Sequence, residues 1–232
     1  MGESARRVSC FKSPHPVLAR HFLRSFPRFA REGTLGRTAL HNAAVMTERF
    51  PTSICVFCGS RTGRDPRYAA ATRGMGQLLA QSGITLVYGG GRVGLMGELA
   101  DACLQAGGRV IGVIPQMLLD REVGHAGLTE LEVVTSLSVR KQRMSDLAQA
   151  FIALPGGIGT LDELFEVWTW SQLHLEHKPC GVLNVGGYYD PLLAFLDRTV
   201  EENFLRAEYR STLIVSRDPA DLLARLAVAR GD

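Results

Sequence analysis

The sequence predicts an α/β fold: a single doubly wound, mostly parallel, Rossmann-like sheet with helices on both faces. The first observation is that short apolar runs rich in β-branched residues alternate with helical stretches from residue 53 onward. The second is that these runs are apolar on both faces, which is typical of parallel strands covered by helices on both sides. The sequence shows no internal repeat and no second domain in this part, so we expect residues 49–232 to form one domain.

Each apolar run is expected to be a strand, and each helical stretch is expected to carry the chain back to the start of the next strand. The predicted strands are Ser53–Cys58, Ile84–Tyr88, Arg109–Ile114, Leu131–Val134, Ala150–Leu154, Cys180–Asn184 and Leu213–Val215. The predicted helices are Arg67–Ser82, Gly94–Ala106, Ser138–Gln149, Thr160–Leu173, Asp190–Glu202 and Pro219–Ala229. Ligands of such sheets bind beyond the carboxyl ends of the strands. The candidate loops are therefore Gly59–Gly63, Gly89–Gly97, Pro115–Gly127, Thr135–Arg143 and Pro155–Glu163.

Composition excludes several classes of protein. No run approaches the roughly 18 apolar residues of a membrane span, which excludes an integral membrane protein. Five cysteines are an odd number in a chain long enough to fold without disulfides, so we expect a reducing, cytoplasmic setting. These cysteines are Cys10, Cys55, Cys58, Cys103 and Cys180.

The net charge of +3 is unevenly distributed along the chain. Residues 1–45 carry eight basic and two acidic residues, whereas the other 187 residues carry 18 basic and 21 acidic residues. The basic character therefore belongs to the first segment and does not indicate nucleic-acid binding by the main domain. Three interpretations of this segment stay open: an Arg-rich transit peptide, a basic arm for an acidic partner, or an upstream extension before a working start at Met46. We expect residues 1–48 to be a disordered or dispensable extension.

The first glycine-rich loop follows the strand Ile84–Tyr88 and opens a helix, with Gly89, Gly91 and Gly94 in a G-x-G-x-x-G spacing. A dinucleotide site would also need an acidic residue at the end of the next strand, which instead ends in Ile114-Pro115. A phosphate or nucleotide loop is therefore favoured over NAD binding, with close helix packing as the structural alternative. The candidates for this additional loop are Ser60, Gly89, Gly90, Gly91, Gly94 and Met96.

The second glycine-rich loop is the stronger candidate. Gly156, Gly157 and Gly159 expose backbone N–H groups at a helix start and Thr160 adds a hydroxyl, which suits a phosphate monoester. Thr160 and Glu163 also match a capping box, which would give Glu163 a purely structural role. Both interpretations are open on the residues alone.

Three basic residues precede this loop: Arg140, Lys141 and Arg143. They lie near the start of another predicted helix. Cations there oppose the helix dipole, so a bound anion or a carboxylate would offset their cost. This makes Arg140 and Lys141 site candidates, while Arg143 is expected to lie on a solvated basic face.

Other patterns indicate structure rather than chemistry. Cys55 and Cys58 have C-x-x-C spacing, but residues i and i+3 of a strand point to opposite faces and no second cysteine pair completes a zinc site. Trp168 and Trp170 are expected to pack rather than to stack on a base.

The chain resembles the Lonely Guy (LOG) family in separated motifs. Pro155–Glu163 reads P-G-G-x-G-T-x-x-E, and it follows Ser138-Val139-Arg140-Lys141 and, further upstream, Gly89–Gly97. The likeness runs from about Ile54 to Ala229. Members are cytokinin riboside 5′-monophosphate phosphoribohydrolases, long mislabelled as lysine decarboxylases, and their Rossmann-like fold agrees with the strand pattern.

The resemblance implies roles for individual residues. It places the catalytic arginine at Arg140 and the catalytic glutamate at Glu163. It places substrate contacts at Glu122, Arg140, Lys141, Gly157, Ile158, Gly159, Thr160, Leu161, Asp162, Glu163 and Thr169. The family usually has Met-His-x-Arg-Lys, and here Leu137 and Ser138 replace the Met and His, which bears on substrate preference.

The resemblance therefore implies a hydrolase that releases free base and ribose 5-phosphate from cytokinin riboside 5′-monophosphates or AMP. We expect a nucleoside 5′-monophosphate as substrate, no metal, no cofactor, no nucleic-acid or membrane partner, and a homodimer. A lysine decarboxylase is disfavoured because this domain offers only Lys141 and Lys178 to carry pyridoxal phosphate. A non-catalytic nucleotide-binding module is the alternative, and it would not need Glu163 together with Arg140.

Overall fold

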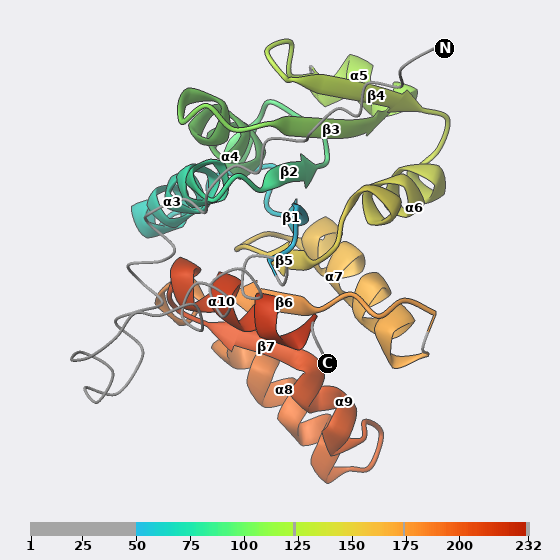
Figure 1. The fold of residues 1–232 in the computed structure, drawn as a ribbon. Coiled ribbons are helices and arrows are strands. Elements are labelled where there is room, and N and C mark those ends of the chain that lie inside the picture. The colour runs from blue at the N-terminus through green and yellow to red at the C-terminus, as the bar shows by residue number, and fades with distance from the viewer. Residues whose placement is uncertain (1–49, 123, 174, 231–232) are drawn as a thin grey trace, which may run out of the picture.

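The computed structural model describes residues 50–122, 124–173 and 175–230, although the side chains of residues 120–122 lie outside this description. Within it, seven strands form one sheet in which every pair of neighbours is parallel (Figure 1). The strands are β1 (Ser53–Phe57), β2 (Thr85–Tyr88), β3 (Val110–Pro115), β4 (Glu130–Val134), β5 (Phe151–Ala153), β6 (Cys180–Leu183) and β7 (Leu213–Ser216). All seven predicted strands are confirmed, with ends that differ by at most one residue.

The strand order is β4-β3-β2-β1-β5-β6-β7. The chain builds outward from β1 to β4 on one side and then crosses back to place β5 on the other side of β1. The sheet is therefore doubly wound, as predicted, and its order reverses between β1 and β5. In such sheets the ligand crevice opens beyond the carboxyl ends of the two strands at this reversal.

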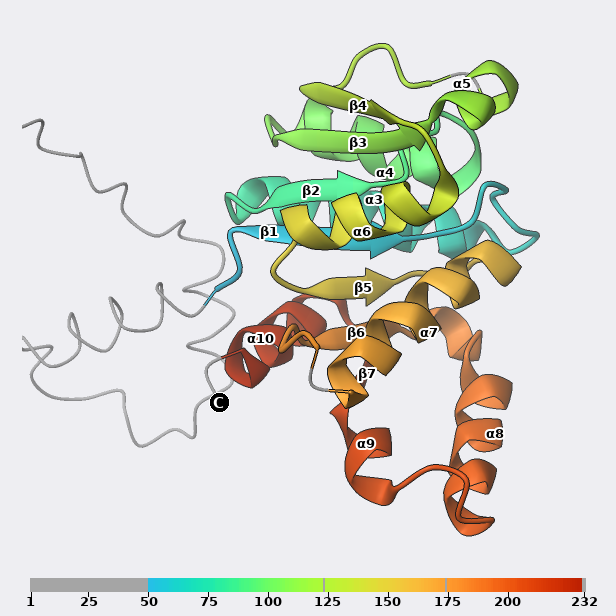
Figure 2. The same ribbon diagram turned by 90° about the vertical axis from the view of Figure 1, so that its right-hand side faces the viewer.

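Helices cover both faces of the sheet (Figure 2). The helices are α3 (Pro66–Gln81), α4 (Gly94–Gln105), α5 (Gln116–Glu122), α6 (Leu137–Leu147), α7 (Ile158–Gln172), α8 (Asp190–Glu201), α9 (Ala207–Thr212), α10 (Pro219–Ala229) and the short 3-10 helix η2 (Val185–Gly187). One core packs residues of α3, α4 and α10 against the sheet, and the other packs residues of α6, α7 and α8. Cys58 belongs to the first core and Cys55 to the second, so the two thiols lie on opposite faces, as predicted.

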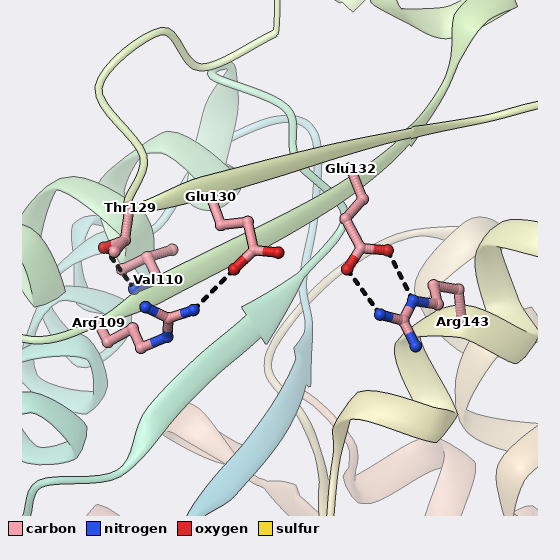
Figure 3. Close-up of polar contacts among 6 residues, drawn as sticks. All are labelled: Arg109, Val110, Thr129, Glu130, Glu132 and Arg143. Atoms are coloured by element: carbon pink, nitrogen blue, oxygen red, sulfur yellow. Dashed lines mark hydrogen bonds and ion pairs between the residues drawn. The ribbon is translucent and has the colours of Figure 1, made fainter.

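Local polar side chains explain where helix α3 begins and how the outer strand of the sheet is held. Asp65 caps α3 by accepting from the Arg67 N–H, with Pro66 at the first helical position. At the outer strand β4, Glu130 pairs with Arg109, and the Thr129 hydroxyl accepts from the Val110 N–H (Figure 3). Charged side chains on an edge strand oppose pairing with another chain.

Two α-helices were not predicted, and a third begins two residues earlier than expected. Helix α5 lies within the segment Pro115–Gly127 that was predicted to be a loop, and α9 follows α8. Both have seven residues or fewer, too few for a helical period to be evident in the sequence. Helix α7 begins at Ile158 rather than at Thr160.

The predicted extension, residues 1–48, lies outside the described residues. In the part of the chain that is described, no helix is both long enough and apolar enough to cross a membrane.

Candidate active site

A pocket of about 530 Å³ opens at the reversal of strand order, where the loops after β1 and β5 meet. Its walls come from the loop after β1, the start of α4, Arg140 on α6, the start of α7 and Tyr188. The lining residues are Cys58, Gly59, Ser60, Arg61, Thr62, Gly63, Tyr68, Leu95, Met96, Arg140, Pro155, Gly156, Gly157, Ile158, Gly159, Thr160, Glu163 and Tyr188. The pocket therefore takes residues from four of the five loops that the sequence indicated: Gly59–Gly63, Gly89–Gly97, Thr135–Arg143 and Pro155–Glu163.

The two loops are fixed to one another and to β6. The Gly59 N–H donates to the Pro155 carbonyl at 3.1 Å. From the segment after β6, the Tyr188 hydroxyl donates to the Gly156 carbonyl at 2.5 Å and the Tyr189 hydroxyl donates to the Leu154 carbonyl at 2.6 Å. These hydrogen bonds hold the Pro155–Gly157 turn in place before any ligand binds.

The start of α7 presents its backbone amides to the pocket. Gly157 is the N-cap residue, and no side chain caps the helix. Thr160 is the third residue of the helix, so the predicted capping box of Thr160 and Glu163 is wrong. The reason is that the helix starts two residues earlier than the pattern suggested. The first amides of a helix have no partner within the helix, so they are available to an anion.

The glycines of this turn differ in what the fold requires of them. A Cβ at Gly156 would lie 2.1 Å from the Thr160 hydroxyl oxygen, so packing explains this glycine. A Cβ at Gly157 or at Gly159 would meet no atom within 4 Å. Packing within the described residues does not explain these two glycines, whereas close approach of a ligand to the backbone would.

Arg140 is held in a fixed position at the base of the pocket. Its Nε donates to the Val113 carbonyl at 3.1 Å, and its Nη2 donates to the Gly89 carbonyl at 3.2 Å. Its Nη1 lies 3.3 Å from the Glu163 Oε1, and both side chains are only 12% exposed. The Val113 carbonyl of β3 and the Gly89 carbonyl of the loop after β2 thus hold the Arg140 guanidinium against the Glu163 carboxylate of α7.

The electrostatics of Glu163 suit a group that reacts rather than a group that only stabilises the fold. Burial raises the pKa of its carboxyl from 4.5 to about 7, although the neighbouring Arg140 opposes this rise. A carboxyl group that titrates near neutral pH at the base of a pocket is a candidate for catalysis. The Cys58 thiol lines the same pocket, but burial and the charge of Glu163 raise its pKa far above neutrality, so it is protonated.

The other cations of α6 are engaged elsewhere. Lys141 pairs with Asp162 at 3.2 Å and with Glu166 at 3.0 Å. Burial opposes the charge of Lys141, but the two carboxylates outweigh it and raise the lysine pKa. Arg143 forms a two-point ion pair with Glu132 on β4, at 2.6 and 2.8 Å (Figure 3). Arg143 is not among the lining residues, and its side chain is ion-paired as well as 41% exposed to solvent.

Comparison with known proteins identifies the family of this chain. The sequence model of a family described as "Possible lysine decarboxylase" matches residues 96–226. A cytokinin riboside 5′-monophosphate phosphoribohydrolase of Rhodococcoides fascians is 49% identical over 177 residues, which are 76% of this chain and 89% of that protein. The enzyme LOG of Oryza sativa, of the same printed name, is 47% identical over 173 residues, covering 75% of this chain and 72% of its own length. The chain belongs to the LOG family.

Solved structures share the fold of this LOG protein. The molybdenum cofactor carrier protein of Chlamydomonas reinhardtii superposes with a TM-score of 0.57 at 20% identity, covering 78% of this chain and 98% of its own. The molybdenum cofactor binding protein of Rippkaea orientalis superposes with a TM-score of 0.55 at 21% identity, covering 75% and 93%. At this identity the likeness concerns the fold alone.

The first glycine-rich loop of the LOG chain is largely a scaffold. Of its candidates, Ser60 and Met96 line the pocket, whereas the glycines Gly89, Gly90, Gly91 and Gly94 are not among the lining residues. A Cβ at Gly94 would lie 2.3 Å from the Ser60 carbonyl carbon, and Gly94 has a φ of +62°. This glycine therefore allows the loops after β1 and β2 to touch.

The predicted substrate contacts divide into two groups. Arg140, Glu163 and the start of α7, with Gly157, Ile158, Gly159 and Thr160, lie together in the pocket. Leu161, Asp162, Lys141 and Thr169 are not among the lining residues, and the Thr169 hydroxyl donates to the Phe165 carbonyl within α7. Glu122 ends α5, but its side chain lies outside the described part.

Two aromatic side chains that line the pocket were not among the predicted site residues. Tyr68 and Tyr188 pack edge to face with ring centroids 5.4 Å apart. The segment Asn184–Asp190 is fixed by its own hydrogen bonds, because the Asn184 amide accepts from the Tyr189 N–H and donates to the Asp190 carboxylate. A Gly-Gly-Tyr-Tyr run after a strand was the available signal, since glycine turns at strand ends face the ligand crevice. Trp168 donates to the Thr212 hydroxyl and is buried, which confirms its predicted packing role.

Proposed function

We propose that this LOG protein hydrolyses the N-glycosidic bond of cytokinin riboside 5′-monophosphates and releases free base and ribose 5-phosphate. One observation carries the proposal: the Glu163 carboxylate, fixed by Arg140, shares a pocket with the uncapped start of α7. The Glu163 carboxylate suits stabilisation of a ribosyl cation, and the uncapped start of α7 suits binding of a phosphate monoester. The printed activity of the relatives at 47–49% identity supports the same reaction.

The reaction breaks the bond between C1′ of the ribose and a nitrogen of the base. The electron pair of that bond leaves with the base, which takes up a proton, and C1′ passes through an oxocarbenium-like cation. The ionised Glu163 stabilises this charge or takes the proton of the water that attacks C1′. The amides of residues 158–160 hold the 5′-phosphate, and this remote binding energy places C1′ against the carboxylate.

The need for a 5′-monophosphate is tested by comparing isopentenyladenosine 5′-monophosphate, AMP and their nucleosides as substrates. Release of free base is measured by chromatography. We expect turnover of the monophosphates and a collapse of turnover for the nucleosides, because a nucleoside leaves the α7 amides without their anion. Equal rates on adenosine and AMP would contradict the phosphate assignment. The extent to which AMP is accepted beside the cytokinin nucleotide is part of the same experiment.

We propose a homodimer as the active unit. Apolar side chains at the pocket mouth and along α6 and α7 support it, because such exposure is costly in an isolated chain. Ile158 is 89% exposed, and Leu173 and Leu175 at the end of α7 are 59% and 68% exposed. Light scattering at assay concentration tests this proposal, and a mass near 25 kDa would contradict it.

We further propose a cytoplasmic location and no role in lysine decarboxylation. The four cysteines of the described part, Cys55, Cys58, Cys103 and Cys180, are buried free thiols, which suits a reducing compartment. Neither Lys141 nor Lys178 lines the pocket, and Lys178 donates to the Ser145 carbonyl at 3.0 Å. Among the described residues, therefore, no lysine lines the pocket on which a decarboxylase site could be built.

A further inference from the structure

Three exposed arginines stand apart from the other cations of the described residues. Arg61 and Arg64 lie on the loop after β1, and Arg92 lies on the loop after β2. For these three, called the mouth arginines below, the described residues supply no carboxylate or carbonyl partner. Every other arginine whose side chain is described has at least one such partner, as do Lys141 and Lys178.

The mouth arginines are gathered at one place in the fold. Arg61 lines the pocket itself. The second loop is pressed against the first, because a Cβ at Gly94 would lie 2.4 Å from the Arg61 backbone nitrogen. Arg64 directly precedes Asp65, whose carboxylate is already occupied by Arg67 and by the start of α3. Arg61 thus lies at the pocket, and Arg64 and Arg92 lie on the two loops that meet beside it, without a carboxylate partner among the described residues.

The charge balance of the pocket points to an anion larger than one phosphate. Among the lining residues, Glu163 is the acid, and Arg140 already faces it. Uncompensated arginines at the mouth attract phosphate groups and bind them through two-point hydrogen bonds. A 5′-phosphate on the α7 amides is bonded to the ribose on one side, so any further phosphates extend away from the ribose, and Arg61 lines the same pocket.

We propose that the mouth arginines form a second anion subsite, which takes the β- and γ-phosphates of a nucleoside 5′-di- or triphosphate. The α-phosphate of such a nucleotide occupies the site of the monophosphate, so the two ligands compete. This subsite was not predicted from the sequence, because the short Pro155–Glu163 loop is suited to a single phosphate. In this proposal the loops after β1 and β2 hold the additional charge. This inference rests on the proposed function for the place of the α-phosphate.

The test compares AMP, ADP and ATP by isothermal titration calorimetry, on Glu163→Gln protein so that no ligand is consumed and with EDTA so that no metal masks the phosphates. We expect ATP to bind about tenfold or more tightly than AMP, with ADP between them. The ratio of the AMP to the ATP dissociation constant should fall as salt rises from low to moderate concentration. Inhibition of base release by ATP in the unmodified protein gives a second measurement of the same ratio.

The variant Arg61→Ala/Arg64→Ala should bring the AMP to ATP ratio close to one. The matched control is Arg198→Ala/Arg206→Ala, which removes two positive charges from the far end of α8 and the turn beyond it and should leave the ratio unchanged. The inference is overturned if ATP binds no more tightly than AMP. It is also overturned if both double variants reduce the ratio equally, because the effect is then general charge. Tight ATP binding without hydrolysis of any monophosphate would contradict the proposed function and leave the subsite intact.

Discussion

Arg140 and Gly89 fit one another so closely that only glycine is compatible with the observed guanidinium. The Arg140 Nη2 donates to the Gly89 carbonyl at 3.2 Å, and a Cβ at position 89 would lie 1.9 Å from the same nitrogen. The glycine of the first loop therefore contributes to the site by positioning the arginine that faces Glu163.

The substitution Gly89→Ala should displace Arg140 and lower kcat/KM by about 100-fold, because a shift of about 1 Å in a catalytic group has an effect of that size. The change in melting temperature should be small beside this loss. Steady-state kinetics and thermal unfolding measure the two effects. A matched control is Gly74→Ala on α3, where a Cβ would meet no atom within 4 Å. It should leave kinetics unchanged and stabilise the fold by about 0.5–1 kcal/mol.

Substitution of the two neighbouring tyrosines after β6 should affect different properties: Tyr188 substrate binding, and Tyr189 the stability of the fold. Tyr188→Phe removes the hydrogen bond to the Gly156 carbonyl, so we expect KM to rise about threefold to tenfold while kcat changes less. Tyr189→Phe leaves the buried Leu154 carbonyl without its donor and should cost about 1–3 kcal/mol of unfolding free energy. If Tyr188→Phe changes only the melting temperature, the hydroxyl serves the fold and not the phosphate turn.

The pH dependence of activity follows from Glu163. Its pKa is about 7 and its active form is the carboxylate, so kcat/KM should rise with pH and level off above about pH 7. The charge of Asp162 contributes to the raised pKa, and Asp162→Asn should therefore move the acid limb to lower pH. A profile that is flat between pH 5 and pH 8 would contradict the role of Glu163. The profile is measured as kcat/KM for one monophosphate across that range.

Removal of residues 1–45 should leave activity and melting temperature unchanged. The charge imbalance and the lack of a periodic apolar face in this segment are the reasons. The truncated chain, which begins at Met46, is compared with the full chain in the same base-release assay and by calorimetry. A large loss in either measurement would mean that the segment packs on the domain or completes the site.

The sequence predicted the sheet well because its strands are apolar on both faces and each is followed by a turn and a helix. The sequence also predicts that Arg140 and Glu163 lie at the same edge of the sheet, because both follow the carboxyl ends of parallel strands. It could not predict what fixes Arg140, because the Val113 and Gly89 carbonyls are 27 and 51 residues away along the chain. The predicted capping box is wrong for a local reason: the N-cap is Gly157, and a glycine N-cap leaves no side-chain signature in the sequence.

The central claim is that the ionised Glu163 carboxylate, set by Arg140, cleaves the glycosidic bond. The most direct test measures free base and ribose 5-phosphate released from isopentenyladenosine 5′-monophosphate by the unmodified protein and by Glu163→Gln. Because burial raises the folded-state pKa of Glu163 above 4.5, its ionisation costs stability progressively between about pH 4.5 and pH 7. The neutral glutamine avoids this cost, so at pH 8 the variant should melt no lower than the unmodified protein. The account predicts a loss of turnover of about 100-fold or more in the folded variant. Near-normal turnover in that variant would contradict it.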